Sequence, residues 1–296
     1  MVEPAAYSAH ERLVHDARAR PELWRLLIGL VIVGVLVTAL NIGVFSVLAG
    51  FVSPELAGDF MEGTSALSML VLLSSFAFIT IGVTVAARQM QHRSLWSMLG
   101  PRREGLVQFW KVMRALIVLG VILAALPPYG FGEPLEQNLS LIKWLLLLPL
   151  SICAVLIQTS AEEVLFRGYI QQSLAARFRS PVIWMGLPSA LFAAGHYAPN
   201  AAGDNAVLVA VWAGVFGLLA ADLTARSGTL GPAIALHLFN NAVALLFVSL
   251  PDNLSGLALF LLPYDMSDTG ELRQWLLVEF AVMIVCWLTA RLAIRR

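Results

Sequence analysis

The stretch LLIGLVIVGVLVTALNIGVFSVLAGFVSP, residues 26–54, contains no charged residue. A membrane-spanning helix needs about 20 consecutive apolar residues, so this stretch is long enough to cross a bilayer. Further uncharged runs follow along the chain, at residues 63–87, 115–132, 144–161, 180–203, 205–221 and 227–251. Membrane β-barrels show alternating rather than unbroken apolar patterns. The runs therefore predict an all-α membrane protein with many spans.

The composition agrees with a chain that lies mostly in lipid. Hydrophobic residues make up 59% of the 296 residues and charged residues 13%, whereas a soluble domain carries about 25% charged residues. The formal net charge is zero, which gives no basis for binding nucleic acid. Cys153 and Cys286 both lie in apolar runs. We expect them to be small core residues rather than a disulfide or part of a metal site.

The apolar segments predict eight transmembrane helices that form a single domain over residues 24–296. Their predicted ranges are 24–50, 64–88, 106–126, 143–161, 181–197, 206–225, 229–250 and 274–293. Arginine and lysine gather before the first span and after every even-numbered span. Because cytoplasmic loops carry the excess of these residues, we expect both termini to be cytoplasmic. Residues 1–23 are polar and charged, and are expected to form a cytoplasmic arm that faces solvent.

Ionisable side chains inside a membrane are costly, so they are candidates for function. One cluster is Glu162, Glu163 and Arg167, within SAEEVLFRG at residues 160–168. Glu163 and Arg167 are four residues apart with the acid first, which lets them pair on one face of a helix. Glu162 is rotated by about 100° from Glu163. It is therefore left to point elsewhere.

Two further groups of polar side chains lie in apolar runs. His237 and Asn241 are four residues apart, so they project at one point from a helix. His196 follows Phe192 at the same spacing, and the phenyl ring is expected to pack beneath the imidazole.

The relative depth of these groups depends on where the fourth span ends. If its helix continues past residue 161 and turns at residues 179–181, Glu162 and His196 both lie roughly 25 Å from the turn. The heights then agree. We therefore expect a cavity inside the membrane that joins Glu162, His196, His237 and Asn241.

Such a cavity would hold the groups needed to hydrolyse a peptide or ester bond with water. A carboxylate and an imidazole can hold and deprotonate a water molecule. An imidazole and a carboxamide can donate hydrogen bonds to a developing oxyanion. Glu162, His196 and His237 could instead bind a divalent metal such as zinc. The residues alone leave open whether the cofactor is such a metal or none.

Three motifs occur in order, each on its own segment: EEVLFRG (162–168), FAAGH (192–196) and HLFNN (237–241). They resemble the three motifs of the CAAX-protease and bacteriocin-processing family of intramembrane proteases, also called CPBP or Abi. The resemblance is to its type II CAAX prenyl endopeptidases and covers roughly residues 141–250.

The resemblance implies an intramembrane endopeptidase that is either glutamate-dependent or a metalloprotease. By this resemblance Glu162 is the general base that activates water, and His196 helps to bind that water. His237 and Asn241 would stabilise the oxyanion. The supporting residues would be Glu163, Arg167 and Phe192.

The resemblance leaves the substrate open between a peptide and a prenylated protein at the membrane. A preference for arginine over lysine favours a bacterial source, and with it the bacterial inner membrane. Two other functions compete with proteolysis. A catalytically silent family member would act as a bacteriocin-immunity or membrane scaffold protein, although it would have no need of His237 with Asn241. A proton-coupled transporter could use the same side chains, but the inverted repeat of many transporters is not evident.

Overall fold

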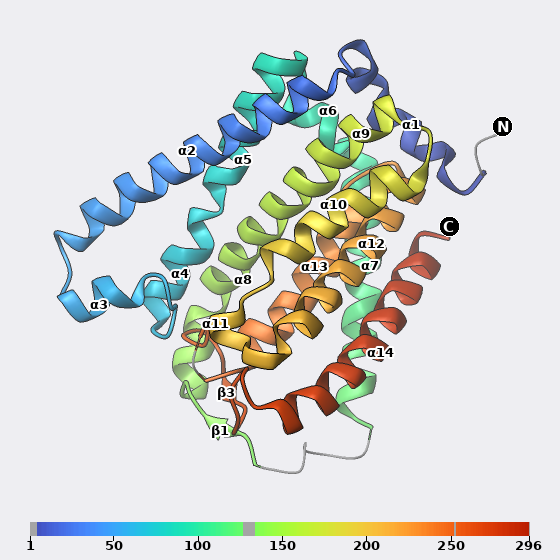
Figure 1. Ribbon diagram of the computed structural model, residues 1–296. Helices are drawn as coiled ribbons and strands as arrows, with labels where there is room; N and C mark the ends of the chain where they lie inside the picture. Colours follow the sequence, from blue (N-terminus) through green and yellow to red (C-terminus); the bar gives the residue numbers. More distant parts are fainter. Residues whose placement is uncertain (1–4, 127–133, 252, 296) are drawn as a thin grey trace.

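A computed structural model describes residues 5–126, 134–251 and 253–295, and these residues form a bundle of helices (Figure 1). Among them, six segments are long and apolar enough to cross a membrane: Leu23–Ala49, Ala66–Gln91, Arg102–Ala124, Leu141–Arg177, Pro199–Ser227 and Leu276–Ile294. Two shorter apolar helices are Pro181–Gly195 and Gly231–Phe247. Every predicted span is helical, so the predicted all-α polytopic fold is confirmed. The count of eight is approximate because two of the helices are short.

The main helices are α2 (Leu23–Ala49), α4 (Ala66–Ser75), α5 (Ala77–Ala86), α7 (Arg102–Ala124), α8 (Leu141–Glu163), α9 (Gln171–Arg177), α10 (Pro181–Gly195), α12 (Ala206–Ser227), α13 (Gly231–Ala242) and α14 (Thr269–Ile294). Short helices are α1 (Glu11–Val14), α3 (Pro54–Asp59), α6 (Leu95–Leu99) and α11 (Pro199–Ala202), with 3-10 turns η1 (Ala5–His10), η2 (His15–Ala19) and η5 (Gly203–Asn205). The π-helical segments η3 (Ala87–Gln91), η4 (Val164–Ile170) and η6 (Val243–Phe247) continue α5, α8 and α13. Residues 1–4 of the predicted arm, and 127–133, 252 and 296 of the predicted domain, lie outside the described part of the chain.

The outer faces of the long helices expose large apolar side chains. Val31 and Ile42 on α2 are each 63% exposed, and Leu146 on α8 is 75% exposed. Leaving such a side chain in water forgoes roughly 1.5–3 kcal/mol of burial free energy, whereas lipid tails remove that loss. The apolar outer surface and the multiple spans identify an integral multi-pass membrane protein.

The fourth predicted span continues well past residue 161. α8, η4 and α9 form one continuous helix from Leu141 to Arg177, and α10 begins at Pro181. Proline is favoured at the start of a helix because its missing N–H would have no helical partner there. The predicted turn between these two helices is confirmed. It sends α10 back along η4 and α9.

α13 lies in the centre of the bundle, where it contacts α7, α8, α12 and α14 (Figure 1). Its residues Ala233 and Ala235 are fully buried, and Leu236 is nearly so. The close approach to α7 depends on a glycine, because a Cβ atom at Gly231 would lie 2.1 Å from the carbonyl oxygen of Gly105. Side chains on α13 are therefore held from several directions.

We expect Gly231→Ala to lower the free energy of unfolding by roughly 1–3 kcal/mol or more, because the added methyl group overpacks two backbones. Thermal unfolding in detergent measures the effect. Gly186→Ala on α10 is the matched control, since nothing lies within 4 Å of its Cβ position. Equal melting temperatures for the two variants would contradict the tight α7–α13 contact.

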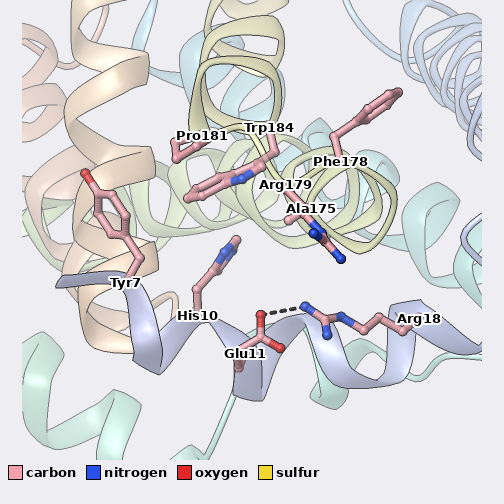
Figure 2. A pocket seen from close by; sticks show the side chains of 9 residues that line it. All are labelled: Tyr7, His10, Glu11, Arg18, Ala175, Phe178, Arg179, Pro181 and Trp184. Atoms are coloured by element: carbon pink, nitrogen blue, oxygen red, sulfur yellow. Dashed lines mark hydrogen bonds and ion pairs between the residues drawn. The ribbon is translucent and has the colours of Figure 1, made fainter. Parts of the chain in front are cut away.

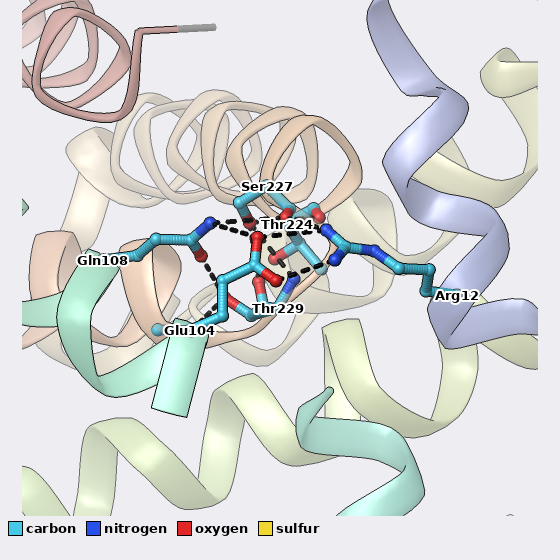
Figure 3. Close-up of polar contacts among 7 residues, drawn as sticks. Arg12, Glu104, Gln108, Thr224, Ser227 and Thr229 are labelled. Carbon is cyan, nitrogen blue, oxygen red and sulfur yellow. Dashed lines mark hydrogen bonds and ion pairs between the residues drawn. The ribbon is translucent and has the colours of Figure 1, made fainter. Parts of the chain in front are cut away.

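The N-terminal segment, residues 5–19, packs against one end of the bundle (Figure 1). Arg12 donates to Glu104 Oε2 at 2.7 Å and to the carbonyl oxygen of Ser227 at 3.0 Å (Figure 3). Contrary to the prediction from the sequence, this arm does not face solvent along its whole length. Its apolar side chains Leu13, Val14 and Ala17 are buried against the bundle.

A small sheet lies at the opposite end of the bundle (Figure 1). β1 (Glu136–Gln137) pairs antiparallel with β3 (Phe260–Leu261), and β3 pairs parallel with β2 (Val248–Ser249). Asn138 Nδ2 donates to the carbonyl oxygen of Ser255 at 2.8 Å. These contacts tie the chain before α8 to the chain that follows η6.

Candidate active site

Glu163, the last residue of α8, is buried between a guanidinium and an imidazole. Its Oε1 accepts hydrogen bonds from Arg167 Nη1 at 2.9 Å and from His237 Nδ1 at 2.8 Å. Glu163 is 0% and Arg167 1% exposed, and Arg167 Nη2 also donates to the carbonyl oxygen of Gly217 at 3.1 Å. The predicted pairing of Glu163 with Arg167 is confirmed. Its contact with His237 adds a partner that helical spacing does not predict.

His237 on α13 links the two adjacent glutamates of α8. Its Nδ1 lies 2.8 Å from Glu163 Oε1, and its Nε2 lies 3.4 Å from Glu162 Oε2. An ionised carboxylate only accepts hydrogen bonds, so Nδ1 carries a proton and Nε2 faces Glu162. Glu162 Oε2 is buried and accepts no hydrogen bond from the described residues. This oxygen can therefore bind a further polar group beside Nε2.

Two carboxylates, one guanidinium and one imidazole lie together in this buried cluster. Glu163 contacts both Arg167 and His237, and Glu162 faces His237 Nε2. A carboxylate and an imidazole in such a contact can exchange a proton. Glu162 and His237 are therefore placed to act as an acid–base pair.

His196 follows the last turn of α10 and is half-buried. Its Nδ1 lies 2.8 Å from the carbonyl oxygen of Phe192, so Nδ1 carries the proton of the neutral ring and Nε2 keeps a lone pair. The Phe192 ring centroid is 4.4 Å from that of His196 and 6.0 Å from that of His237. The predicted contact between Phe192 and His196 is confirmed. The two imidazoles are separated by no more than the sum of these distances.

Asn241 lies one turn after His237 and is held by a residue outside the three motifs. Its Nδ2 donates to Gln158 Oε1 at 2.9 Å, and its Oδ1 accepts from Asn240 Nδ2 at 3.3 Å. Gln158 is 6% exposed and precedes Glu162 by four residues on α8. This spacing of four residues could have identified Gln158 from the sequence, because it places an amide on the same helix face as Glu162, the candidate base.

The three side chains that could ligate zinc do not form a ligand set. Among the described residues, no group of three His, Cys, Asp or Glu side chains is arranged to hold a metal ion. Glu162 Oε2 faces His237 Nε2 directly, at 3.4 Å. Two ligands of one tetrahedral zinc ion also lie roughly 3.3 Å apart, so this distance suits both a carboxylate–imidazole pair and two ligands of one ion.

A small cavity lies elsewhere, where the N-terminal segment packs over the turn between α9 and α10 (Figure 2). It has a volume of about 50 Å³ and is lined by Tyr7, His10, Glu11, Arg18, Ala175, Phe178, Arg179, Pro181 and Trp184. Burial, together with the positive charge of Arg18, lowers the pKa of His10 to about 4. None of the predicted site residues lines this cavity, so it is not the predicted intramembrane cavity.

The comparison with known proteins covers the segments that carry the three motifs. The model of the family described as type II CAAX prenyl endopeptidase Rce1-like matches residues 143–243. The uncharacterized protein YyaK of Bacillus subtilis (strain 168) is 27% identical over 251 residues, which cover 79% of this chain and 81% of that protein. No solved structure matches the chain. The resemblance carried by the three motifs is confirmed: over the helices that hold its buried glutamates and histidines, this membrane protein is similar to the type II CAAX prenyl endopeptidase Rce1-like family.

Proposed function

We propose that this protein is an intramembrane endopeptidase that hydrolyses peptide bonds of membrane-associated substrates, with water activated by Glu162 as the nucleophile. One observation carries the proposal. Glu162 Oε2 is buried, accepts no hydrogen bond from the described residues, and lies 3.4 Å from His237 Nε2. A general base needs an oxygen that can reach a water proton, and an adjacent N–H can bind the substrate carbonyl. The family similarity over residues 143–243 supports the same reaction.

In the proposed reaction Glu162 begins ionised, and His237 is protonated on both nitrogens with Nδ1 held by Glu163. Glu162 takes a proton from water while the water oxygen bonds to the substrate carbonyl carbon. The carbonyl oxygen becomes an oxyanion, which accepts hydrogen bonds from His237 Nε2 and Asn241 Nδ2. Glu162 then gives its proton to the amide nitrogen and the C–N bond breaks. The products are a carboxyl group and an amine.

The supporting residues have separate roles in this scheme. His196 Nε2 accepts a hydrogen bond from the attacking water, which orients the oxygen lone pair toward the substrate. Glu163 stabilises the protonated imidazole of His237, at 2.8 Å. Arg167 holds the Glu163 carboxylate in place through a hydrogen bond of 2.9 Å.

The walls of the site favour a substrate with an apolar side chain or lipid near the cleaved bond. The Phe216 ring centroid lies 4.8 Å from that of His237, and the Phe192 centroid lies 6.0 Å from it. The family description names prenyl endopeptidases. The proposed substrates are therefore membrane-associated peptides and prenylated protein tails.

His196→Ala is expected to lower peptide cleavage by about 100-fold, the lower end of what a general acid–base partner contributes. The measurement uses the purified protein in detergent and a quenched fluorescent peptide with an apolar core. His15→Ala is the matched control, because the His15 side chain is 86% exposed on the N-terminal segment. Equal rates for the two variants would remove His196 from the mechanism.

The same assay separates proteolysis from the two competing functions. A silent scaffold or immunity protein would leave the peptide intact in the wild type. A proton-coupled transporter would also leave the peptide intact, and in a second measurement it would change the pH inside vesicles that contain the protein. Addition of a metal chelator tests whether cleavage depends on a bound ion.

A further inference from the structure

α8 and α13 make two side-chain contacts at the site, one helical turn apart. Glu162 faces His237 at 3.4 Å, and Gln158 accepts a hydrogen bond from Asn241 at 2.9 Å. Each pair lies four residues from the other on its own helix. The earlier residue on α8 contacts the later residue on α13, so the two helices run antiparallel here.

The Gln158 contact decides which way the Asn241 carboxamide points. An asparagine amide can rotate by about 180° with little change in shape, which exchanges its oxygen and nitrogen. In the observed orientation Nδ2 donates to Gln158 Oε1 while Oδ1 accepts from Asn240 Nδ2. With the Gln158 amide in its observed orientation, a rotated Asn241 amide would set Oδ1 against Gln158 Oε1, oxygen against oxygen. It would also present an acceptor, rather than a donor, to an oxyanion.

Nδ2 of Asn241 has two hydrogens, and Gln158 takes one of them. The second hydrogen stays available to another acceptor. Because the first is fixed by a buried partner, the direction of the second is fixed as well. Preorganised donors of this kind stabilise developing negative charge without having to reorient during the reaction.

Gln158 differs from the buried hydroxyl residues of α8. Thr159 beside it is fully buried, and its hydroxyl donates to the carbonyl oxygen of Val155 in the same helix. Ser151 similarly donates to the carbonyl oxygen of Leu147. Gln158 instead reaches across to α13. Burial of a carboxamide without a partner is costly, so its presence in this apolar run is tied to its contact with Asn241.

We propose that Gln158 is a positioning residue for the proposed hydrolysis, and that it orients the Asn241 carboxamide so that Nδ2 donates to the substrate oxyanion. The inference rests on the proposed function. It assigns to Gln158 an effect that passes entirely through Asn241. A residue that only holds α8 against α13 would act independently of Asn241.

The test is a double-mutant cycle in the peptide-cleavage assay. Gln158→Met keeps the length of the side chain and removes the acceptor. We expect it to lower kcat roughly tenfold, less than the about 100-fold or more of a deleted oxyanion donor, with KM within about twofold. In an Asn241→Ala background the same substitution should change kcat by less than about twofold. Thr159→Val is the matched control, because it removes a buried hydroxyl at the neighbouring position whose hydrogen bonds stay within α8.

Equal losses from Gln158→Met in both backgrounds would overturn the inference, as would no loss in the wild-type background. Binding of a phosphonamidate peptide gives a second measurement that needs no turnover, because its tetrahedral oxygen resembles the oxyanion. Gln158→Met should weaken this inhibitor more than it weakens the uncleaved substrate. Failure of the proposed function is recognised separately, by full cleavage in a Glu162→Gln variant.

Discussion

Glu162→Gln is expected to reduce peptide cleavage by roughly 1,000-fold or more while the protein stays folded, because the variant loses its general base. The amide has nearly the shape of the carboxyl group, and its oxygen can still face His237 Nε2, which lies 3.4 Å from Glu162 Oε2. What it lacks is the ability to accept a proton from water. The quantity to measure is kcat on the quenched peptide, with the melting temperature recorded for both proteins.

The control for this substitution is Glu55→Gln, which makes the same chemical change on the exposed helix α3. Its rate should match that of the wild type. A Glu162→Gln variant that retains more than about one tenth of the activity would rule out Glu162 as the base. Such a result would assign the water to another group, since a lost base costs about 100-fold or more.

Arg167→Met is expected to lower the free energy of unfolding by about 3–5 kcal/mol, because removing one partner of a buried ion pair leaves the other charge uncompensated. Arg167 and Glu163 are 1% and 0% exposed, and the guanidinium also holds the Gly217 carbonyl oxygen at 3.1 Å. Methionine fills much of the space but supplies no donor. Unfolding in detergent, followed by helical circular dichroism, measures the loss.

The double variant Glu163→Gln with Arg167→Met separates charge from packing. A neutral amide at position 163 no longer needs a cation, so most of the lost stability should return. Activity should not return, because His237 Nδ1 loses the carboxylate oxygen that holds the ring at 2.8 Å. Equal stability for the single and double variants would show that the pair does not act through its charge.

The spans of the fold could be predicted from the sequence because their signal is local. Each uncharged run is long enough to indicate a span without information from the rest of the chain. The helical segments overlap every predicted range, although the fourth continues to Arg177. The N-terminal segment gave no such signal, since Leu13, Val14 and Ala17 are scattered among charged residues. The two-residue strands are too short for any pattern to indicate.

The side-chain contacts of the site that lie within one helix could be predicted from the sequence. The contacts between two helices could not. Glu163 with Arg167 follows from a spacing of four residues on a single helix. The contacts of Glu163 with His237 and of Gln158 with Asn241 depend on the position of α13 along the axis of α8. Nothing in either segment alone fixes that register. The convergence of His196 with Glu162 in one reaction remains a prediction that the cleavage assay tests.

The π-helical segment η4, Val164–Ile170, begins immediately after Glu163. A π-helix closes its hydrogen bonds over five residues instead of four, so it changes the phase between the helix before it and the helix after it. α8 presents its carboxylates to α13, while Gln172 on α9 bonds the Met98 carbonyl oxygen at 2.9 Å. Deleting one residue within η4 would turn one of these faces by about 100° relative to the other. The π-helical segment thus sets the rotation between α8 and α9, so that one continuous helix contacts α13 with one face and α6 with another.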